Sequence, residues 1–326
     1  MFDSHKILIT GGTGSWGQTL TKKLLREYDP SQVIIFSRGE YNQVMMQRKF
    51  KDHRLKYVIG DVRDYDAVYK ATKGVSCVFH LAALKHVPLC EENVEEAIKT
   101  NIDGTLNVIK ASIENGVSKV IDVSTDKAAE PVNLYGMTKA VGEKAIISAN
   151  SEYTKFVCIR GGNVMGSNGS VIPLWIDQIK SRGLIDLTDS RMTRFFMTLE
   201  EAIGLVFKAA MCSVGGELFV MNMPSYRMKD VAEVLIEHYD PSCCIAEIGL
   251  REGEKLHETL LTSYEAVNSY FYEKDYFVAL PINPSKKLLT LYESRGAFTH
   301  SEFTSNTFTL SKEECKKVLQ RGGFLK

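Results

Sequence analysis

The sequence lacks any long apolar segment. No apolar run approaches the roughly 18 residues that a helix needs to cross a bilayer, which argues against a membrane-spanning protein. The first residues, MFDSHKILITGG, lead directly into a strand-like run and do not resemble a signal peptide. We therefore expect a soluble, cytoplasmic protein with no membrane partner.

The sequence also lacks a cysteine framework and an excess of one charge. Its seven cysteines are scattered without a Cys-x-x-Cys motif, so we expect reduced thiols and no metal site. Cys243 and Cys244 are adjacent, and we interpret them as two ordinary thiols rather than a redox pair. Lysine plus arginine equals aspartate plus glutamate, at 40 each, which gives no reason to propose a nucleic-acid partner.

The first half of the chain shows a regular alternation of short apolar runs and amphipathic stretches. The runs are β-branched and nearly continuous, as expected for parallel strands covered on both faces. The alternation predicts βαβ units, whose right-handed crossovers place the carboxyl ends of the strands at one ligand-binding edge. The predicted strands are 6–10, 32–37, 55–60, 75–83, 118–125 and 155–160, and the predicted helices include 16–27, 94–115 and 136–149.

Beyond residue 160 the pattern becomes irregular, which indicates a second structural unit. We predict an α/β fold, a doubly wound parallel sheet of the Rossmann type with a second, smaller substrate-binding lobe. The dinucleotide-binding domain should comprise residues 1–162 with a return segment near 195–220, and residues 163–326 should form mainly the lobe and a C-terminal tail. The further predictions are a Gly/Asn-rich active-site loop at 161–170, helices at 171–183, 198–212 and 228–240, a strand at 216–222, a mixed segment at 245–261, an extended tail at 298–310 and a capping box at Ser311-x-x-Glu314.

A glycine-rich loop marks a cofactor site. Gly11, Gly14 and Gly17 follow the first predicted strand and precede the first predicted helix as G-x-x-G-x-x-G. Glycine permits the unusual dihedral angles of such a turn and the close approach of a pyrophosphate, while the helix N-terminus offers free N–H groups to the phosphates. The arrangement predicts a bound dinucleotide.

The end of the second strand bears on which dinucleotide is bound. An acidic residue there would bind the ribose of NAD, whereas this strand ends with Ser37 and Arg38. A hydroxyl and a guanidinium suit a 2′-phosphate, so the sequence favours NADP, although Glu40 lies two residues beyond. The alternative is that Arg38 is a solvated surface residue. The predicted lining of the cofactor site is Gly11, Thr13, Gly14, Ser15, Gly17, Ser37, Arg38, Asp61, Val62, Ala82, Ala83 and Lys85.

A Tyr-x-x-x-Lys motif marks the reaction centre. Tyr135 and Lys139 are four residues apart on a predicted helix, so they share one face. A phenol with a pKa near ~10 is a poor base at neutral pH, but a nearby ammonium and an oxidised nicotinamide both favour the phenolate. The phenolate can take a proton from a hydroxyl while hydride leaves the carbon. Asp126 and Lys127 form a second acid–base pair after the fifth strand, the alternative being a surface ion pair or a capping aspartate.

The motif S-T-D-K-A-x-x-P-x-N-x-Y-G-x-T-K at 124–139 resembles the extended short-chain dehydrogenases/reductases that modify nucleotide sugars. Within them, it looks like the small soluble inverting UDP-N-acetylglucosamine 4,6-dehydratases of pseudaminic acid biosynthesis. Retaining relatives have T-D-E where this chain has Thr125, Asp126 and Lys127, which favours inversion at C5. The same resemblance extends over most of the chain in GGTGS-x-G (11–17), SR-x-E (37–40), GDVRD (60–64), AALKHVP (82–88), KTNI-x-G (99–104), RMTRF (191–195) and GEKLHE (253–258).

The resemblance implies a mechanism. Tyr135, assisted by Lys139, would deprotonate the 4-hydroxyl of UDP-GlcNAc while hydride passes to NADP⁺, with Thr125 hydrogen-bonded near that hydroxyl. Lys127 would then remove the C5 proton, and Asp126 would protonate the departing 6-hydroxyl. Hydride returns to C6 and C5 is reprotonated from the opposite face, which gives a UDP-4-keto-6-deoxy sugar. Lys127 must be neutral to act as a base, which requires burial and nearby positive charge.

The resemblance also implies a substrate site and an assembly. Asn163 and the loop 167–173 should hold the sugar and diphosphate. Asn101, Tyr135 and Lys139 should also bind the cofactor, and Asn101 should support the catalytic centre. Helices 94–115 and 136–149 should pair across an interface, so we expect a homo-oligomer that is at least a dimer. The residues expected to bind the UDP-sugar are Lys85, Asn163, Ser170, Val171, Arg194, Arg251 and Glu254, since arginine suits phosphate and carboxylate suits ribose hydroxyls.

Two departures from the family leave the product open. Residues 160–163 read R-G-G-N instead of R-Y-G-N, and the lost aromatic should open space near the sugar. Residues 251–255 read R-E-G-E-K instead of R-P-G-E-K. Three alternatives remain: a 5,6-dehydratase or a partner enzyme that handles a 5,6-ene sugar, a nucleotide-sugar 4-epimerase that needs only Tyr135 and Lys139, and a non-catalytic NADP-sensing regulator.

Overall fold

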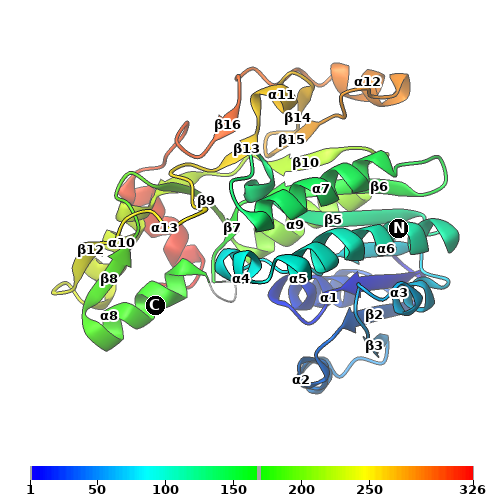
Figure 1. The fold of residues 1–326 in the computed structure, drawn as a ribbon, viewed down its shortest axis with the longest axis horizontal. Helices are drawn as coiled ribbons and strands as arrows, with labels where there is room; N and C mark the ends of the chain where they lie inside the picture. The colour runs from blue at the N-terminus through cyan, green and yellow to red at the C-terminus, as the bar shows by residue number, and fades with distance from the viewer. Residues whose placement is uncertain (1, 167–169, 326) are drawn as a thin grey trace.

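Nine strands form the large sheet at the centre of this computed structural model, which describes residues 2–166 and 170–325 (Figure 1). They are β1 (Lys6–Thr10), β2 (Gln32–Ser37), β3 (Leu55–Ile59), β4 (Cys77–His80), β5 (Lys119–Thr125), β6 (Lys155–Gly161), β10 (Leu218–Met221), β14 (Ser269–Tyr272) and β15 (Tyr276–Ala279). Their order is β14-β15-β10-β6-β5-β4-β1-β2-β3, and the strands from β10 to β3 pair in parallel. The predicted doubly wound parallel sheet is confirmed, with its strand order reversing beside β1 and β4, where such folds bind ligands.

Helices cover both faces of this sheet (Figure 1). Successive side chains of β1 point to opposite faces, so that Leu8 packs into one apolar cluster while Ile7 and Ile9 pack into the other. The helices of this part are α1 (Ser15–Glu27), α2 (Glu40–Phe50), α3 (Tyr65–Thr72), α4 (Val87–Glu92), α5 (Val94–Ile98), α6 (Gly104–Glu114), α7 (Leu134–Ser148), α9 (Leu199–Cys212), α11 (Ser263–Ala266) and α12 (Lys286–Glu293). One layer contains α3, α6 and α7 in contact, and the other contains α1 against α9.

The structure differs from the sequence expectation in several elements. The apolar pattern does not single out α2, because only Gln43 and Met46 are buried along it. The expected helix 94–115 is α5 and α6 joined by a π-helical turn at Lys99–Asp103, which widens the helix locally. The antiparallel pair β14 and β15 extends the large sheet beyond β10. This sheet therefore includes strands from residues 269–279 in addition to β10, which lies in the expected return segment near 195–220.

The smaller lobe has an apolar core of its own, which includes Trp175 and Leu235. Two small sheets border it: β7 (Asn163–Val164) and β11 (Ser225–Arg227) on either side of β9 (Thr193–Met197), and β8 (Leu184–Leu187) with β12 (Cys244–Glu247). A further pair, β13 (Thr259–Leu261) with β16 (Phe303–Thr304), packs against the core of the large sheet. Its helices are α8 (Val171–Arg182), α10 (Met228–Tyr239) and α13 (Lys312–Arg321). The predicted capping box is confirmed, because Ser311 and Glu314 satisfy each other's backbone N–H groups at the start of α13.

A buried arginine connects several elements beside α7. Arg160 on β6 is 1% exposed and forms ion pairs with Glu143 of α7 and Glu265 of α11. It also donates a hydrogen bond of 2.8 Å to the carbonyl oxygen of Leu260. Burial alone would lower the pKa of this guanidinium, but the two carboxylates raise it well above its ordinary value. Loss of either carboxylate would leave a poorly compensated buried charge, which is strongly destabilising.

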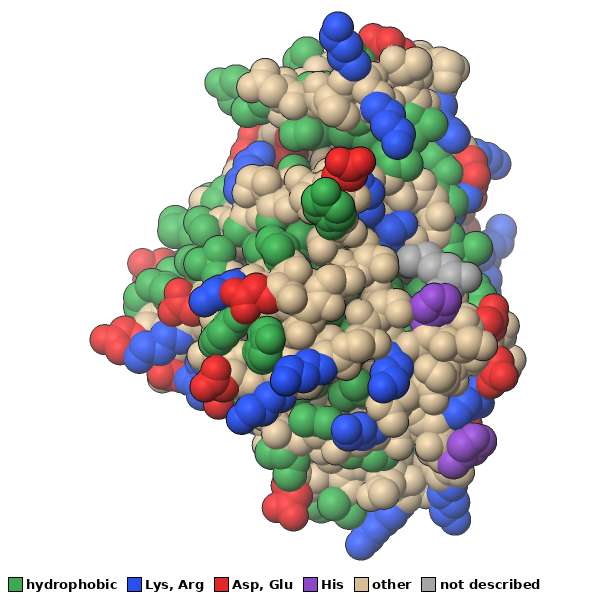
Figure 2. All heavy atoms as spheres, turned by 90° about the vertical axis from the view of Figure 1, so that its right-hand side faces the viewer, with side chains coloured by type: hydrophobic (Ala, Val, Ile, Leu, Met, Phe, Trp, Pro, Cys, Tyr) green, Lys and Arg blue, Asp and Glu red, His purple; other side chains and the backbone are tan. Residues whose placement is uncertain are grey.

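The surface carries charges of both signs (Figure 2), and the cysteines are free thiols. Within residues 2–166 and 170–325, no helix is both long and apolar enough to cross a membrane. Figure 2 shows a face on which basic and acidic side chains both occur, together with scattered apolar ones. All seven cysteines are free thiols, so Cys243 and Cys244 do not form a disulfide.

Candidate active site

A cavity of about 720 Å³ opens at the carboxyl edge of the large sheet. Its walls come from the segments after β1 to β6 and from the first turns of α7 and α8. Part of the expected sugar loop, residues 167–169, lies outside the described residues. The predicted residues that line the cavity are Gly11, Thr13, Gly14, Ser15, Gly17, Ser37, Arg38, Asp61, Val62, Ala82, Ala83, Lys85, Thr125, Lys127, Tyr135, Lys139, Asn163, Ser170 and Val171. The predicted residues that do not line it are Asn101, Asp126, Arg194, Arg251 and Glu254.

The glycine-rich loop has the geometry expected of a phosphate site. Gly11 has a φ of 64°, and a Cβ there would lie 2.9 Å from the Cα of Ala82. A Cβ at Gly17 would collide with the carbonyl oxygen of Gly12, so glycine is required for α1 to approach the loop. Helix α1 begins after Gly14 without a side-chain cap, which leaves its first N–H groups available to an anion.

The end of β2 carries a loosely held cation. Asp61 accepts hydrogen bonds of 2.6 and 2.9 Å from Arg63, and the Arg38 guanidinium lies 3.9 Å from the same carboxylate. Burial alone would raise the pKa of Asp61, but its hydrogen bonds with Arg63 bring the pKa below its ordinary value. The Arg38 side chain is 53% exposed, so it can turn toward a ligand without breaking a short contact. Ser37 Oγ accepts a hydrogen bond of 3.0 Å from Gln43.

The Tyr135–Lys139 pair faces the cavity from the first turns of α7. Asn133 caps this helix, and its Oδ1 accepts a hydrogen bond of 2.8 Å from the N–H of Gly136. Burial raises the pKa of the Tyr135 phenol, while the ammonium groups of Lys139 and Lys127 and a hydrogen bond with Thr125 lower it. Burial outweighs these influences, so the phenol holds its proton at neutral pH unless further positive charge enters the cavity.

Lys127 lies at the centre of a cluster of four charged side chains. Its Nζ is 3.0 Å from Asp126 Oδ1, 3.2 Å from Asn163 Oδ1 and 3.7 Å from Glu258 Oε1. The Arg194 Nε lies 3.6 Å from the same oxygen of Glu258. Asp126 Oδ2 and Glu258 Oε2 are buried and have no hydrogen-bond partner among residues 2–166 and 170–325. Two carboxylates and two cations are therefore held together largely out of water.

The protonation of Lys127 differs from the sequence expectation. The expected neutral amine requires burial and nearby positive charge, and burial and Arg194 do lower the pKa of Lys127. Asp126 and Glu258 raise it more, so the pKa lies above its ordinary value and Lys127 is an ammonium in this structure. The condition for a basic Lys127 is therefore not met in this arrangement, because the carboxylates of the neighbouring Asp126 and of Glu258, from a distant segment, outweigh burial and Arg194.

Asn101 supports the cavity wall from behind rather than lining it. Its side chain lies in the π-helical turn and is 1% exposed. The amide accepts a hydrogen bond of 2.8 Å from the N–H of Leu84 and donates to the Leu84 carbonyl at 2.9 Å and to Thr138 Oγ1 at 3.0 Å. These contacts fix the segment after β4 against α7, which is a supporting role of the kind expected.

The residues expected to hold the uridine diphosphate do not line the cavity. Arg194 is 7% exposed and donates to the backbone carbonyl groups of Thr193, Leu256 and Lys255 at 2.7 to 3.1 Å. Arg251 is exposed and lies 3.8 Å from Glu254. In this conformation Arg194 therefore organises the segment that carries Glu258.

The expected opening beside Gly161 is absent. A Cβ at this position would collide with the terminal methyl of Met197 and would lie 4.0 Å from the ring of Trp16. Met197 is fully buried, so its side chain occupies the space that an aromatic residue at position 161 would need. The expectation of extra room near the sugar is contradicted, because a residue on β9 fills the gap.

Sequence reasoning missed several residues of the site. Trp16 and Phe196 line the cavity, and Glu258 contacts Lys127 from the lobe. Trp16 and Glu258 lie within motifs already noted, GGTGSWG and GEKLHE, so the signal was present without an assigned role. Asp122 carried a different signal, a carboxylate in the middle of the otherwise apolar run VIDV.

Comparisons with known proteins agree with this geometry. A family described as polysaccharide biosynthesis protein matches residues 7–280. A UDP-N-acetylglucosamine 4,6-dehydratase (inverting) from Campylobacter jejuni is 44% identical over 294 residues, covering 89% of this chain and 86% of the relative. A UDP-glucose 4-epimerase from Rickettsia conorii is 39% identical over 98% of this chain and 96% of its own length. The crystal structure of Pen from Bacillus thuringiensis superposes with a TM-score of 0.91 at 41% identity, with 100% of both chains covered.

Proposed function

The chain belongs to the polysaccharide biosynthesis protein family, among relatives named as nucleotide-sugar dehydratases and epimerases, and we propose that it is an NADP-dependent, C5-inverting UDP-GlcNAc 4,6-dehydratase. One observation carries the proposal: Tyr135, Lys139 and Lys127 line the same cavity as the glycine-rich loop. A 4-epimerase needs only the first two of these side chains. Lys127 adds a second proton-transfer group, which suits a dehydratase.

The cofactor half of the cavity suits NADP. The uncapped N-terminus of α1 would receive the pyrophosphate, and Ser37 with Arg38 would hold the 2′-phosphate. Asp61 and Lys85 line the same half and would contact the cofactor. When bound, a nicotinamide dinucleotide supplies the acceptor and later the donor of hydride.

The first step falls to Tyr135 and Lys139. The Tyr135 phenol is buried and protonated, so it acts as a base only after its pKa falls. Lys139 and Lys127 already lower this pKa, and the positive charge of an oxidised nicotinamide acts in the same direction. The Tyr135 phenolate then takes the proton of the sugar 4-hydroxyl as C4 is oxidised to a ketone.

The elimination falls to Asp126 and Lys127. The elimination requires Lys127 as a neutral amine and Asp126 as a neutral carboxylic acid. This form of the pair carries one titratable proton, as does the ammonium–carboxylate ion pair in the structure. Because Lys127 Nζ and Asp126 Oδ1 are 3.0 Å apart, one proton transfer along this hydrogen bond produces the neutral acid and the neutral amine. Lys127 then takes the C5 proton, which the 4-ketone has made acidic, and Asp126 gives its proton to the departing 6-hydroxyl. Water leaves and the ion pair returns.

Asp126 needs a path to the sugar because it is fully buried and does not line the cavity. Thr125 does line the cavity, and its Oγ1 lies 3.0 Å from Asp126 Oδ1. We propose that the Thr125 hydroxyl relays the proton. Asn163, Ser170 and Val171, which also line the cavity, would contact the sugar and diphosphate, whereas Arg194, Arg251 and Glu254 would reach the uridine only after a rearrangement of the segment 251–258.

The exposed faces of two helices support a homodimer. Leu106 and Ile113 on α6, and Met137 and Val141 on α7, are each 47 to 49% exposed. Apolar side chains grouped on neighbouring helices are typical of a surface that a second copy covers. The seven free thiols suit a reducing compartment, and we propose a cytoplasmic location.

Incubation of the purified protein with UDP-GlcNAc in deuterium oxide tests the function. We expect a 4-keto-6-deoxy sugar with deuterium and inverted configuration at C5. NMR and mass spectrometry detect this product. A product that keeps its 4-hydroxyl and contains a 5,6 double bond would favour the partial reaction. Interconversion of UDP-GlcNAc and UDP-GalNAc would identify a 4-epimerase, and binding of NADP without turnover of any sugar would favour a regulator.

A further inference from the structure

Asp122 is a carboxylate at the centre of the large sheet that the reaction described above does not use. It lies on β5 and is 0% exposed. In the parallel register it pairs with His80 on β4 and with Cys158 on β6, so a row of polar side chains crosses a region where apolar residues are expected. A carboxylate in such a place is costly unless it is paired, which raises the question of its partner.

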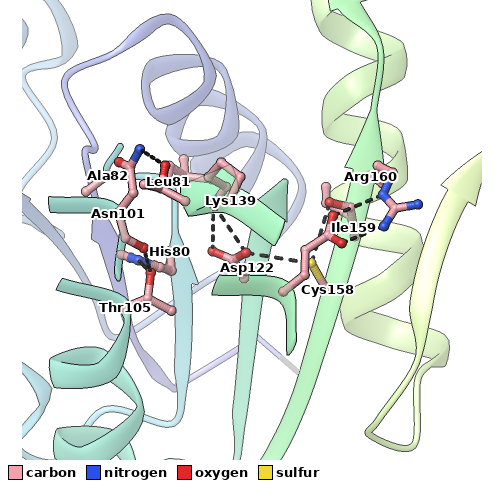
Figure 3. A network of polar contacts seen from close by, with 12 residues as sticks. His80, Leu81, Ala82, Asn101, Thr105, Asp122, Lys139, Cys158, Ile159 and Arg160 are labelled. Carbon is pink, nitrogen blue, oxygen red and sulfur yellow. Dashed lines mark hydrogen bonds and ion pairs between the residues drawn. The ribbon is translucent and has the colours of Figure 1, made fainter. Parts of the chain in front are cut away.

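The partner is the catalytic lysine. Lys139 Nζ lies 3.4 Å from Asp122 Oδ2 and 3.5 Å from Oδ1, and Figure 3 shows the two side chains pointing toward each other from α7 and β5. Lys139 is itself only 3% exposed. The thiol of Cys158 lies 3.6 Å from Asp122 Oδ2 on the other side.

Stability alone gives a poor reason for this pair, because a buried ion pair is often no more stabilising than apolar side chains of similar volume. Lys139, however, lines the cavity beside Tyr135, so its position is set by the chemistry there. We propose that Asp122 is a positioning residue of the reaction centre, which keeps Lys139 ionised and anchors its ammonium at the floor of the cavity. This inference rests on the proposed role of the Tyr135–Lys139 pair, but not on the identity of the sugar.

The other titratable groups around Asp122 and Lys139 do not supply the negative charge that keeps Lys139 ionised. His80 is neutral, since burial lowers its pKa to about 4, and its ring nitrogens are held by Thr10 and Thr105. Burial raises the pKa of the Cys158 thiol well above its ordinary value, so it carries no charge. Glu143, on the same helix as Lys139, is already paired with Arg160.

The balance at Lys139 follows from these neighbours. Burial lowers the pKa of Lys139, and Asp122 is the largest influence that raises it, ahead of Tyr135, Cys158 and Glu143. The result is a pKa above the ordinary value. Without the Asp122 charge, burial would prevail and the pKa of Lys139 would fall.

Titration of Lys139 tests the proposal directly. The protein is labelled with ¹³C at the lysine ε-carbons, and the Lys139 resonance is identified as the one missing from Lys139→Met. We expect Asp122→Asn to lower the pKa of Lys139 by more than one pH unit, and the activity to acquire a loss at alkaline pH that the natural protein does not show. An unchanged Lys139 titration in folded Asp122→Asn would overturn the proposal.

Two further variants separate positioning from packing. Cys158→Ala removes the other contact of Asp122 without removing charge, and we expect the Lys139 titration to stay unchanged. If Asp122→Asn does not fold, the combined Asp122→Asn, Lys139→Met variant decides, because it leaves no unpaired buried charge. We expect this double variant to regain the cooperative thermal unfolding that Asp122→Asn lacks, and a double variant that also fails to fold would contradict the coupling. The Lys139 titration and the thermal unfolding need no sugar, so they test Asp122 even if the UDP-GlcNAc reaction fails.

Discussion

The two halves of the cavity differ in how they are built. The cofactor half consists of short segments that directly follow β1, β2, β3 and β4, and the predicted side chains there, from Gly11 to Lys85, line it. The half proposed to bind the sugar was expected to use side chains from the lobe, but Arg194, Arg251 and Glu254 do not line the cavity. A site made of backbone at strand ends is fixed by the sheet itself. A site made of long side chains from another lobe depends on which partners those side chains find.

The largest expected effect lies where the two halves meet. Tyr135→Phe removes the base for the first step, so no later step can begin, and we expect turnover to fall about 10⁴-fold, at the upper end for a lost acid–base group. Binding of NADP, followed by fluorescence, should be nearly unchanged. Tyr153→Phe is a matched control, because Tyr153 is 87% exposed. Substantial turnover by Tyr135→Phe would show that another group begins the reaction.

The next effect isolates the sugar half. Lys127→Met removes the proposed C5 base but leaves Tyr135 and Lys139 in place, so we expect the dehydrated product to form about 10²- to 10³-fold more slowly. Oxidation at C4 should continue, and a single-turnover measurement should show reduced cofactor accumulating. Lys22→Met, on the exposed side of α1, serves as the control. Equal losses of both steps would mean that Lys127 does not act separately on the elimination.

A third variant tests the cofactor half alone. Arg38→Ala removes the proposed charge-assisted contacts with the 2′-phosphate, which are worth about 1.5–3 kcal/mol in total, so the Kd for NADP should rise about 10- to 100-fold. The Kd for NAD, measured by calorimetry, should stay nearly constant. Arg26→Ala, at another exposed position, should change neither. An equal loss for both cofactors would place Arg38 outside the 2′-phosphate site.

The smallest expected effect concerns the charge cluster. Glu258 raises the pKa of Lys127, so Glu258→Gln should lower that pKa by about one unit. The Asp126–Lys127 pair must keep its shared proton to act, and this proton is lost as pH rises through the pKa of Lys127. The alkaline limb of the dehydration rate should therefore move to lower pH by the same amount. The pH–rate profile measures this shift, with Glu252→Gln as an exposed control. A shift to higher pH would show that Glu258 does not act through Lys127.

The sequence predicts well what local chain geometry dictates. The glycines at 11, 14 and 17, the strand ends and the four-residue spacing of Tyr135 and Lys139 each act through the backbone of their own segment. The part of the Lys127 environment that such reasoning could not reach is Glu258, which adds to the effect of the neighbouring Asp126 from a segment more than a hundred residues away. The space beside Gly161 was misjudged for the same reason, since Met197 on another strand fills it.

The three-way contact at Arg160 has a mechanical consequence. It joins β6, α7 and α11 through two buried ion pairs, and separating any of these elements would expose an unpaired charge to a dry interior. Helix α7 and the segment from Leu260 to α11 should therefore move as one rigid body. The opposite wall, around Asn163, is held by the two-residue strand β7, which pairs with β9. We therefore expect the wall around Asn163 to move when a nucleotide sugar enters the cavity, while Tyr135 and Lys139 on α7 keep their positions.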